Sequence, residues 1–344
     1  MQSSDKNRRI VLNERPKGEP NDNTLRLEEA SIPQPGDGEV LLRTVYLSLD
    51  PYMRGRMSAA KSYANPVEIG DTMVGGTVSR VVTSKNKRFN EGDWVLSQGG
   101  WQDYSITNGE GVINLGADTP NPSWALGILG MPGFTAWAGL EFIGEPKAGE
   151  TVVVAAATGP VGATVGQIAK LKGCRVVGIA GGEEKCRYAI EELGFDACID
   201  RREGDLKVAL KEACPDGIDV YFENVGGAVF DAVLPLMNPH GRIPVCGLVA
   251  QYNATSLPEG PDRSPLILGT ILTQKLRVQG FIIFDTFGHK FPEFQKVMQA
   301  WLKEGKIKYR EDMVEGLEKA PQALYGMLKG ENFGKLVVRV GPDS

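Results

Sequence analysis

The sequence contains very little histidine, and this scarcity limits the chemistry that it can support. Only two histidines, His240 and His289, occur among 344 residues. Neither belongs to a cysteine and histidine pattern with the spacing of a structural zinc site. A histidine-based metal site or proton relay is therefore not expected, and the sequence predicts no bound metal.

Disulfide bonds and membrane spans are also not expected. The cysteines are odd in number, well separated and without a Cys-x-x-Cys pair, which is typical of reduced thiols: Cys174, Cys186, Cys198, Cys214 and Cys246. No stretch approaches the roughly 18 consecutive apolar residues of a membrane span. The first ten residues are polar and lack the apolar core of a signal peptide. We therefore expect a cytoplasmic protein.

The charge pattern argues against nucleic acid as a partner. The 38 Lys and Arg residues are outnumbered by 43 Asp and Glu residues, the net charge is −5, and no basic block occurs. Apolar residues make up 42% and charged residues 24%, which is typical of a globular enzyme. At about 150 residues per domain, the length predicts two domains.

The two parts of the chain differ in their pattern of apolar, polar and turn residues. The first 120 residues contain short β-branched runs bounded by turn residues, which indicate a β-rich domain. From residue 151, apolar strands alternate with helical patterns, as in a doubly wound parallel sheet of an α/β protein. The predicted strands of the first part cover 39–50, 73–83 and 92–97, and the six of the second part cover 151–157, 175–180, 197–200, 219–223, 242–246 and 277–283.

Helices are predicted over 161–172 and 184–193, each followed by a glycine, Gly173 or Gly194, where a left-handed residue ends a helix. Further helical patterns surround 294–303 and 320–329. The last apolar run, 335–340, is predicted to be a strand that returns to the first domain. The polar segment 248–265 is too long for an ordinary connection and indicates a functional or interface loop.

A glycine-rich turn is the strongest local signal. The buried strand from Thr151 runs into Gly159-Pro160-Val161-Gly162 and then into a helix that contains Gly166. Small residues let the backbone approach a pyrophosphate, and the N–H groups at the helix start attract its charge. The alternative is a tight strand-to-helix connection alone, but the strand, helix and second strand at the expected distances favour a dinucleotide site.

The end of the second strand decides between NAD and NADP. An acidic residue there would bind a free 2′-hydroxyl, but the sequence has Ala180 and Gly181. Lys185 and Arg201 are cations that could attract a 2′-phosphate instead. NADP(H) is therefore preferred. The alternative for Lys185 is a solvated helix residue, because two glutamates precede it.

Several short sequence segments resemble segments of one protein family. They include 45–56, the run Gly130 to Ala136, Glu223-Asn-Val-Gly-Gly227 and Gly330-Glu-Asn-Phe-Gly-Lys335. Together they resemble the zinc-independent alkenal and prostaglandin reductase branch of the medium-chain dehydrogenase/reductases. Zinc-dependent relatives carry Gly-His-Glu where this chain has Gly70-Asp71-Thr72.

The resemblance implies an architecture. It predicts a GroES-like β-rich catalytic domain over 1–129, completed by 304–344, and a Rossmann NADPH-binding domain over 130–303. It also implies a homodimer. Without zinc, hydride addition to an electrophilic double bond is more plausible than alcohol oxidation.

The resemblance further implies reduction of conjugated enones, with curcumin-like diarylheptanoids as expected substrates. Such a reaction stabilises an enolate and protonates the α-carbon, tasks that suit a neutral phenol. The candidates are Tyr52, Tyr63 and Tyr252. Each could equally be a packed aromatic residue, and solvent could supply the proton.

The remaining cofactor contacts follow from the resemblance. Asn224 would lie near the nicotinamide, although a turn residue before two glycines is the better interpretation from the residues alone. Arg201 stands where relatives have a tyrosine. The other expected contacts follow the fifth and sixth strands or lie in the tail: Cys246, Gly247, Tyr252, Phe281, Ile282, Ile283, Asn332 and Gly334.

Two alternatives to an enone reductase remain open. A quinone is also a conjugated acceptor that needs no metal, so a quinone reductase would use the same site. A non-catalytic NADPH-binding redox sensor could use the same fold, because a fold does not determine a function.

Overall fold

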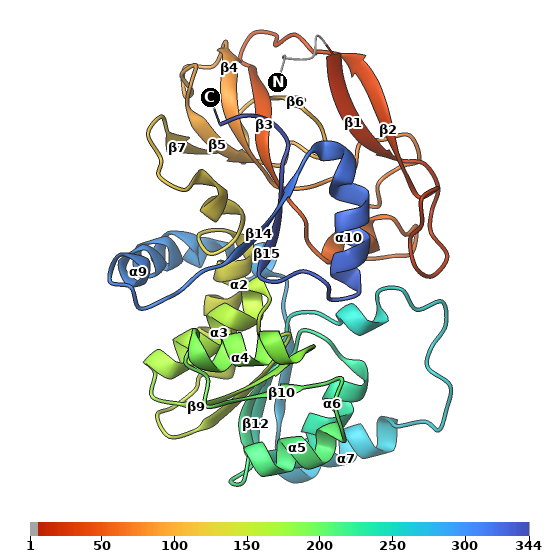
Figure 1. Ribbon diagram of the computed structural model, residues 1–344, viewed down its shortest axis with the longest axis vertical. Helices are drawn as coiled ribbons and strands as arrows, with labels where there is room; N and C mark the ends of the chain where they lie inside the picture. The colour runs from red at the N-terminus through yellow and green to blue at the C-terminus, as the bar shows by residue number, and fades with distance from the viewer. Residues whose placement is uncertain (1–5, 344) are drawn as a thin grey trace. The chain divides into compact units, whose positions relative to one another are not determined.

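The computed structural model describes residues 6–343, and contacts divide the chain into two compact units (Figure 1). The first unit combines Met1–Gly127 with Glu311–Ser344, and the second is Ile128–Arg310. The first unit is therefore assembled from both ends of the chain, whereas the second is continuous.

The first unit is built on a mixed seven-stranded sheet and a two-stranded antiparallel sheet, β1-β2. The order of the larger sheet is β14-β15-β3-β4-β5-β7, with β6 paired to β3. The elements are β1 (Lys6–Leu12), β2 (Leu25–Ser31), β3 (Val40–Ser48), α1 (Tyr52–Arg56), β4 (Thr77–Ser84), β5 (Trp94–Ser97), β6 (Tyr104–Thr107), β7 (Ile113–Gly116), η1 (Pro122–Leu126), β14 (Glu311–Glu315), η6 (Leu317–Lys319), α10 (Ala320–Leu328) and β15 (Lys335–Arg339).

The tail of the chain completes the core of the first unit. β15 lies between β14 and β3, and Val338 is paired with Leu47. The predicted tail strand is therefore present and pairs as expected. The strand predicted over 73–83 begins only at Thr77, where pairing with β3 starts, and it ends at Ser84.

The second unit contains a six-stranded parallel sheet of order β10-β9-β8-β11-β12-β13. This is the doubly wound order, in which the chain runs from β8 through β9 to β10 and then returns to the other side of β8 with β11. The elements are α2 (Met131–Gly139), η2 (Leu140–Gly144), β8 (Thr151–Ala155), α3 (Pro160–Leu171), β9 (Arg175–Ala180), α4 (Glu183–Glu191), β10 (Ala197–Asp200), α5 (Leu206–Ala213), β11 (Ile218–Phe222), α6 (Gly227–Val233), η3 (Leu234–Leu236), β12 (Met237–Val245), η4 (Val249–Gln251), α7 (Ser264–Gln274), β13 (Arg277–Gly280), α8 (Ile283–Phe287), η5 (Gly288–Lys290) and α9 (Phe291–Lys303).

All six predicted strands of this sheet are present, with shifts at their ends. β8 ends two residues early, where Ala156 takes the left-handed φ of 53°. Gly173 and Gly194 follow α3 and α4 with φ of 79° and 74°. The left-handed geometry predicted after both helices is therefore confirmed.

The last residues of the second unit, Lys308 and Arg310, contact side chains of α3 and α4. The Gln167 side chain donates to the Lys308 carbonyl at 3.0 Å and accepts its N–H at 2.7 Å. Lys308 also forms an ion pair with Glu192 at 2.8 Å, and the Arg310 guanidinium lies 5.6 Å from the Tyr188 ring centroid. Since Gln167 is only 5% exposed, this contact is part of the core.

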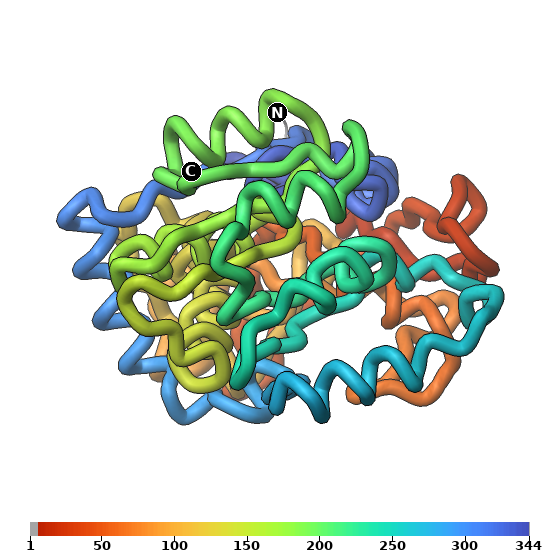
Figure 2. The backbone as a smooth tube through the Cα atoms, turned by 90° about the horizontal axis from the view of Figure 1, so that it is seen from below, coloured from red at the N-terminus to blue at the C-terminus, as the bar shows by residue number. Residues whose placement is uncertain are grey.

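The segment 248–265 contains one short turn of helix, η4, and then leads into α7 (Figure 2). β13, which follows α7, is the last strand of the parallel sheet, and all four of its residues are exposed. α7 has no buried residue. Its large apolar side chains Leu266, Leu268 and Leu272 are 52%, 64% and 78% exposed. This edge of the second unit is therefore apolar and uncovered.

Candidate functional site

The glycine-rich turn lies at the carboxyl end of β8. Gly159 caps α3 in an extended conformation, and Pro160 occupies the first helical position. A Cβ at Gly162 would lie 2.3 Å from the Ala156 carbonyl oxygen. Only glycine therefore lets α3 start this close to β8, which leaves the first N–H groups of α3 available to an anionic group.

Two arginines lie over the end of β9. A Cβ at Gly181 would be 3.1 Å from Nε of Arg202 and 3.5 Å from Nε of Arg201. The Asp200 carboxylate accepts the N–H of Gly182 at 2.8 Å and that of Arg202 at 3.0 Å. These backbone hydrogen bonds hold the pKa of Asp200 below its usual value. The end of β9 thus has two guanidinium groups where a 2′-phosphate would be expected.

Lys185 stands in the first turn of α4, directly after this segment. It is half-buried, whereas Glu183 and Glu184 before it are exposed. The two glutamates project into solvent, so they do not settle the role of Lys185. Lys185 lies at the same carboxyl end of the sheet as Arg201 and Arg202, and its role in a phosphate subsite stays a prediction.

A buried carboxylate shapes the loop after β11. Glu223 is 1% exposed, and its Oε1 accepts the N–H groups of Val225 at 2.6 Å and Gly226 at 2.8 Å. Burial raises the pKa of Glu223, and these hydrogen bonds oppose the shift. The Asn224 side chain donates to the Ala155 carbonyl at 2.9 Å. Asn224 therefore joins the ends of β8 and β11, which is a structural role in its own right.

The residues after β12 pack against the same loop. The N–H groups of Cys246 and Gly247 donate to the Glu223 carbonyl at 2.9 and 3.2 Å. The Tyr252 hydroxyl accepts the N–H of Leu248 at 3.5 Å and lies 3.2 Å from the position of a Cβ at Gly247. Burial raises the pKa of the Cys246 thiol to about 12, so it remains protonated at neutral pH.

Two of the three predicted cofactor contacts after β13 have buried side chains. Phe281 and Ile283 are each 7% exposed, and Phe281 packs edge-on against Phe222. Ile282, at 39%, is the exposed member of the three. Any contact of Phe281 or Ile283 with a cofactor would therefore involve the backbone.

Tyr52 and Tyr63 belong to the first unit. Tyr52 begins α1, and burial together with Asp50 raises the pKa of its hydroxyl. Tyr63, which is 62% exposed, raises this pKa by less than Asp50 does. Tyr252 belongs to the second unit.

A buried ion pair fixes the backbone before Tyr52. The Lys335 ammonium donates to Asp50 at 2.8 Å and to the Leu49 carbonyl at 2.7 Å, and Ser48 donates to the other Asp50 oxygen. The side chains of Lys335 and Asp50 are 1% and 7% exposed.

The tail residues Asn332 and Gly334 lie just before Lys335 in the sequence. The Asn332 side chain donates to the Gly334 carbonyl at 2.9 Å, and Gly334 has a φ of 97°. Their side-chain and backbone geometry thus shapes the turn that leads into Lys335.

The sequence reasoning missed four of these residues. Asp50 and Lys335 lie in phrases shared with the family, and a lysine that opens an apolar strand was a signal for a buried partner. Arg202 follows Arg201 directly, so a doubled arginine after the third strand was visible. Glu223 gave no separate signal, because an acidic residue at a strand end is ordinary.

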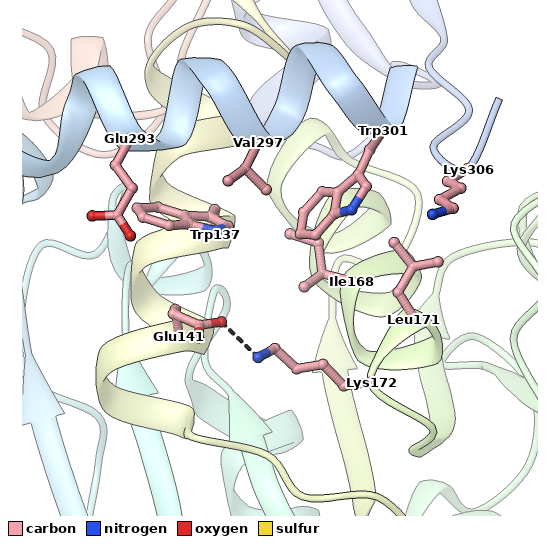
Figure 3. Close-up of a pocket in the computed structure, with 9 residues that line it drawn as sticks. All are labelled: Trp137, Glu141, Ile168, Leu171, Lys172, Glu293, Val297, Trp301 and Lys306. Atoms are coloured by element: carbon pink, nitrogen blue, oxygen red, sulfur yellow. Dashed lines mark ion pairs between the residues drawn. The ribbon is translucent and has the colours of Figure 1, made fainter. Parts of the chain in front are cut away.

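A groove of 360 Å³ elsewhere on the second unit contains none of the predicted site residues (Figure 3). Glu141 and Lys172 form an ion pair of 2.6 Å across its wall. Its lining comes from α2, η2, α3, α9 and the segments after α3 and α9: Trp137, Glu141, Ile168, Leu171, Lys172, Glu293, Val297, Trp301 and Lys306.

Within residues 6–343, no three His, Cys, Asp or Glu side chains are grouped so that they could hold a metal ion. No helix in that range is long and apolar enough to cross a membrane.

The parallel sheet with its glycine-rich turn, in a chain with a β-rich companion unit, defines a dinucleotide-dependent oxidoreductase. Residues 8–115 match the family model of the N-terminal domain of oxidoreductase, and residues 160–303 match that of zinc-binding dehydrogenase. The chain belongs to the medium-chain dehydrogenase/reductase family, in its zinc-independent reductase branch.

Individual relatives match over nearly the whole chain. The NADPH-dependent curcumin reductase of Escherichia coli (strain K12) is 62% identical, over 99% of both chains. The 2-alkenal reductase (NADP(+)-dependent) of Nicotiana tabacum is 41% identical over 98% of both. The crystal structure of CurA from Vibrio vulnificus in complex with NADPH is 58% identical, with a TM-score of 0.95, over 97% of this chain and 99% of that chain.

Proposed function

We propose that this chain is an NADPH-dependent reductase of the carbon–carbon double bond of α,β-unsaturated ketones and aldehydes, including curcumin-like diarylheptanoids. The observation that carries the proposal is the identity of 62% over the whole chain to a relative named for this reaction.

The residues at the end of the parallel sheet fit NADPH. Gly159 and Gly162 bring the start of α3 close to β8, which suits a pyrophosphate. Arg201 and Arg202 flank Gly181 at the end of β9, and their positive charge favours a 2′-phosphate over a free hydroxyl. Lys185 would add a third cation.

NADPH, when bound, supplies a hydride for the β-carbon of the enone. Lys185, Arg201 and Arg202 would hold the 2′-phosphate, and the loops after β11 and β12 would support the ring end of the cofactor. A phenol then donates a hydrogen bond to the developing enolate oxygen. Tyr252, Tyr52 and Tyr63 are the candidates, and the raised pKa of Tyr52 keeps its proton in place at neutral pH.

Substitution of each candidate tyrosine identifies the phenol. We expect Tyr252→Phe to lower kcat by about 100-fold with the KM for NADPH nearly unchanged. Tyr52→Phe and Tyr63→Phe are compared in parallel, and Tyr104→Phe in β6 serves as the matched control. Full kcat in all three candidate variants would assign protonation to solvent.

The activity is tested by following NADPH consumption with curcumin, a simple alkenal and a small quinone, with NADH run beside NADPH. We expect a product two hydrogens heavier at the enone double bond and faster turnover with NADPH. A hydroquinone as the only product would make the chain a quinone reductase. NADPH binding without turnover of any acceptor would make it a redox sensor.

We also propose a homodimer and a cytoplasmic location. The exposed edge strand β13 and the apolar face of α7 would be covered by a second copy, because an unpaired edge of this kind otherwise promotes aggregation. All five cysteines are free thiols, which is typical of a reducing compartment.

A further inference from the structure

The turn of helix that leads into Tyr252 has no buried side chain. This turn is η4, whose residues Val249, Ala250 and Gln251 are all at least partly exposed, and Tyr252 follows directly as its C-terminal cap. A segment without buried side chains gains little stability from packing, so backbone hydrogen bonds have to hold it in place. The partners of those hydrogen bonds therefore contribute to the position of Tyr252.

The backbone of η4 is hydrogen-bonded to the loop that follows β11. The Val249 N–H donates to the Asn224 carbonyl at 3.2 Å, and the Ala250 N–H donates to the Val225 carbonyl at 3.0 Å. Both donors belong to η4, and both acceptors belong to residues 224–227 of the loop. A shift of the loop would therefore shift η4 and the tyrosine that follows it.

The carboxylate of Glu223 holds the loop from its buried side. Its Oε1 accepts the N–H groups of Val225 at 2.6 Å and Gly226 at 2.8 Å, and Glu223 is only 1% exposed. Gly226 and Gly227 both have a left-handed φ, of 76° and 58°. Because glycine loses more conformational freedom on folding than other residues, this loop depends on its hydrogen bonds to keep one conformation.

The backbone of residue 223 makes separate contacts that do not need the carboxylate. Its carbonyl accepts the N–H groups of Cys246 and Gly247, and its N–H donates to the Pro244 carbonyl at 3.0 Å. A side-chain substitution at Glu223 leaves these three hydrogen bonds possible, because they involve no side-chain atom. Such a substitution would therefore release the loop and η4 while the first residues after β12 stay attached.

We propose that Glu223 is a positioning residue, whose carboxylate keeps Tyr252 in place through the loop after β11 and through η4. Its effect on turnover rests on the proposed function, because that effect assumes that Tyr252 is the phenol that hydrogen-bonds the enolate oxygen. Its effect on the backbone does not depend on that assumption, since it concerns only hydrogen bonds within the second unit.

Loss of the Glu223 carboxylate would displace the phenol more than the cofactor. A hydrogen bond to a developing enolate oxygen stabilises it only at the right distance and angle, so a displaced Tyr252 donates less effectively in the transition state. The glycine-rich turn after β8 and the cations near the end of β9, which would bind NADPH, lie on other strands of the sheet. We therefore expect kcat to fall while the KM for NADPH changes less than about threefold.

The effect on the backbone is tested by hydrogen exchange and mass spectrometry of the full-length protein with Glu223→Ala. We expect peptides that cover 247–253 to exchange about tenfold faster than in the unmodified protein, because the acceptors of the Val249 and Ala250 N–H groups are no longer fixed. Peptides from β8 should exchange at unchanged rates. The matched control is Glu212→Ala, at an exposed glutamate of α5, which should leave both regions unchanged.

The effect on turnover is tested by a double-mutant cycle with Tyr252→Phe, with curcumin as the substrate. We expect Glu223→Ala to lower kcat about 30-fold when Tyr252 is present and less than about threefold in the Tyr252→Phe background, because Glu223 acts through this one hydroxyl. Glu223→Gln should retain most of kcat, since its amide oxygen can accept the same two N–H groups as Oε1. A residue that only stabilises the fold would give equal losses in both backgrounds.

Three results would count against Glu223 as a positioning residue. Unchanged exchange over 247–253 in Glu223→Ala would overturn the proposal. Faster exchange with equal losses of kcat in both backgrounds would overturn the action through Tyr252. If Tyr252→Phe keeps full kcat, the assignment of the phenol fails, and the exchange measurement still decides the effect on the backbone. Glu223→Asp, whose carboxylate is one methylene shorter, replaces Glu223→Ala should the alanine variant misfold.

Discussion

The buried ion pair between Lys335 and Asp50 links the tail of the chain to the residues before Tyr52. Removing one member of a buried pair leaves an uncompensated charge, which costs about 3–5 kcal/mol of stability. We expect this loss for Lys335→Met in urea unfolding. The double variant Lys335→Met with Asp50→Asn should regain more than half of it. Equal stability of the two variants would contradict the account.

A second prediction concerns Glu223 and pH. Burial raises the pKa of this carboxyl in the folded protein, so the fold favours its neutral form. Its contribution to stability is therefore fully present below the unfolded pKa and is lost as pH rises through the folded pKa. Glu223→Gln mimics the neutral form. We expect its Tm, relative to the unmodified protein, to be higher at pH 8 than at pH 5.

The control for this measurement is Glu203→Gln, since Glu203 is an exposed glutamate of the same unit. Its Tm difference from the unmodified protein should not vary with pH between the same limits. A Glu223→Gln difference that is equally independent of pH would show that the Glu223 carboxylate is not destabilised by burial.

Lys185 offers a third prediction at this scale. Because it would bind the 2′-phosphate far from the reacting carbon, Lys185→Glu should raise the KM for NADPH about tenfold and change kcat much less. The KM for NADH should remain nearly constant. The control is Lys211→Glu, the same charge reversal at an exposed residue of α5. An unchanged KM for NADPH would remove Lys185 from the cofactor site.

At the scale of elements, α3 depends on the absence of a side chain at Gly166. A Cβ there would lie 2.0 Å from the ring of Phe195, which is itself 3% exposed. Overpacking of this kind costs about 1–3 kcal/mol. We expect Gly166→Ala to lower the free energy of unfolding by that amount, measured in urea. Addition of Phe195→Leu should restore part of the loss, and no restoration would show that the clash lies elsewhere.

The elements of the second unit are predictable from sequence because buried parallel strands are apolar along their length. Val152, Val153 and Val154 are all fully buried in β8, and glycines mark the ends of α3 and α4. β1 and β2 escape this reasoning, because charged side chains interrupt both strands, although Ile10, Val11 and Leu12 at the end of β1 are buried. The strand predicted over 277–283 ends at Gly280 because α8 begins at Ile283.

Only the part of the candidate site that one local sequence motif forms can be predicted from the sequence. The glycine-rich turn needs no distant information, because Gly159 and Gly162 act through the adjoining strand and helix. The partner of Asp50 could not be deduced, since Lys335 lies 285 residues away. The position of Arg202 over Gly181 likewise requires the pairing of β9 with β10.

At the scale of the whole molecule, the exposed edge of the second unit predicts its assembly. A charge on the apolar face of α7 would have to be buried in the proposed homodimer. We expect Leu272→Glu to convert a dimer to a monomer in size-exclusion chromatography with light scattering. Val208→Glu, on the exposed side of α5, provides a matched control that should stay dimeric. A Leu272→Glu dimer would exclude α7 from the interface.

The discontinuous first unit also has a consequence for synthesis on the ribosome. β3 emerges before the second unit, whereas β15, which pairs with it, and Lys335, which neutralises Asp50, emerge only after the second unit has been translated. The second unit is continuous and can close its sheet while the first still lacks two strands. Nascent chains stalled before residue 335 should therefore contain a protease-resistant second unit beside an accessible first unit.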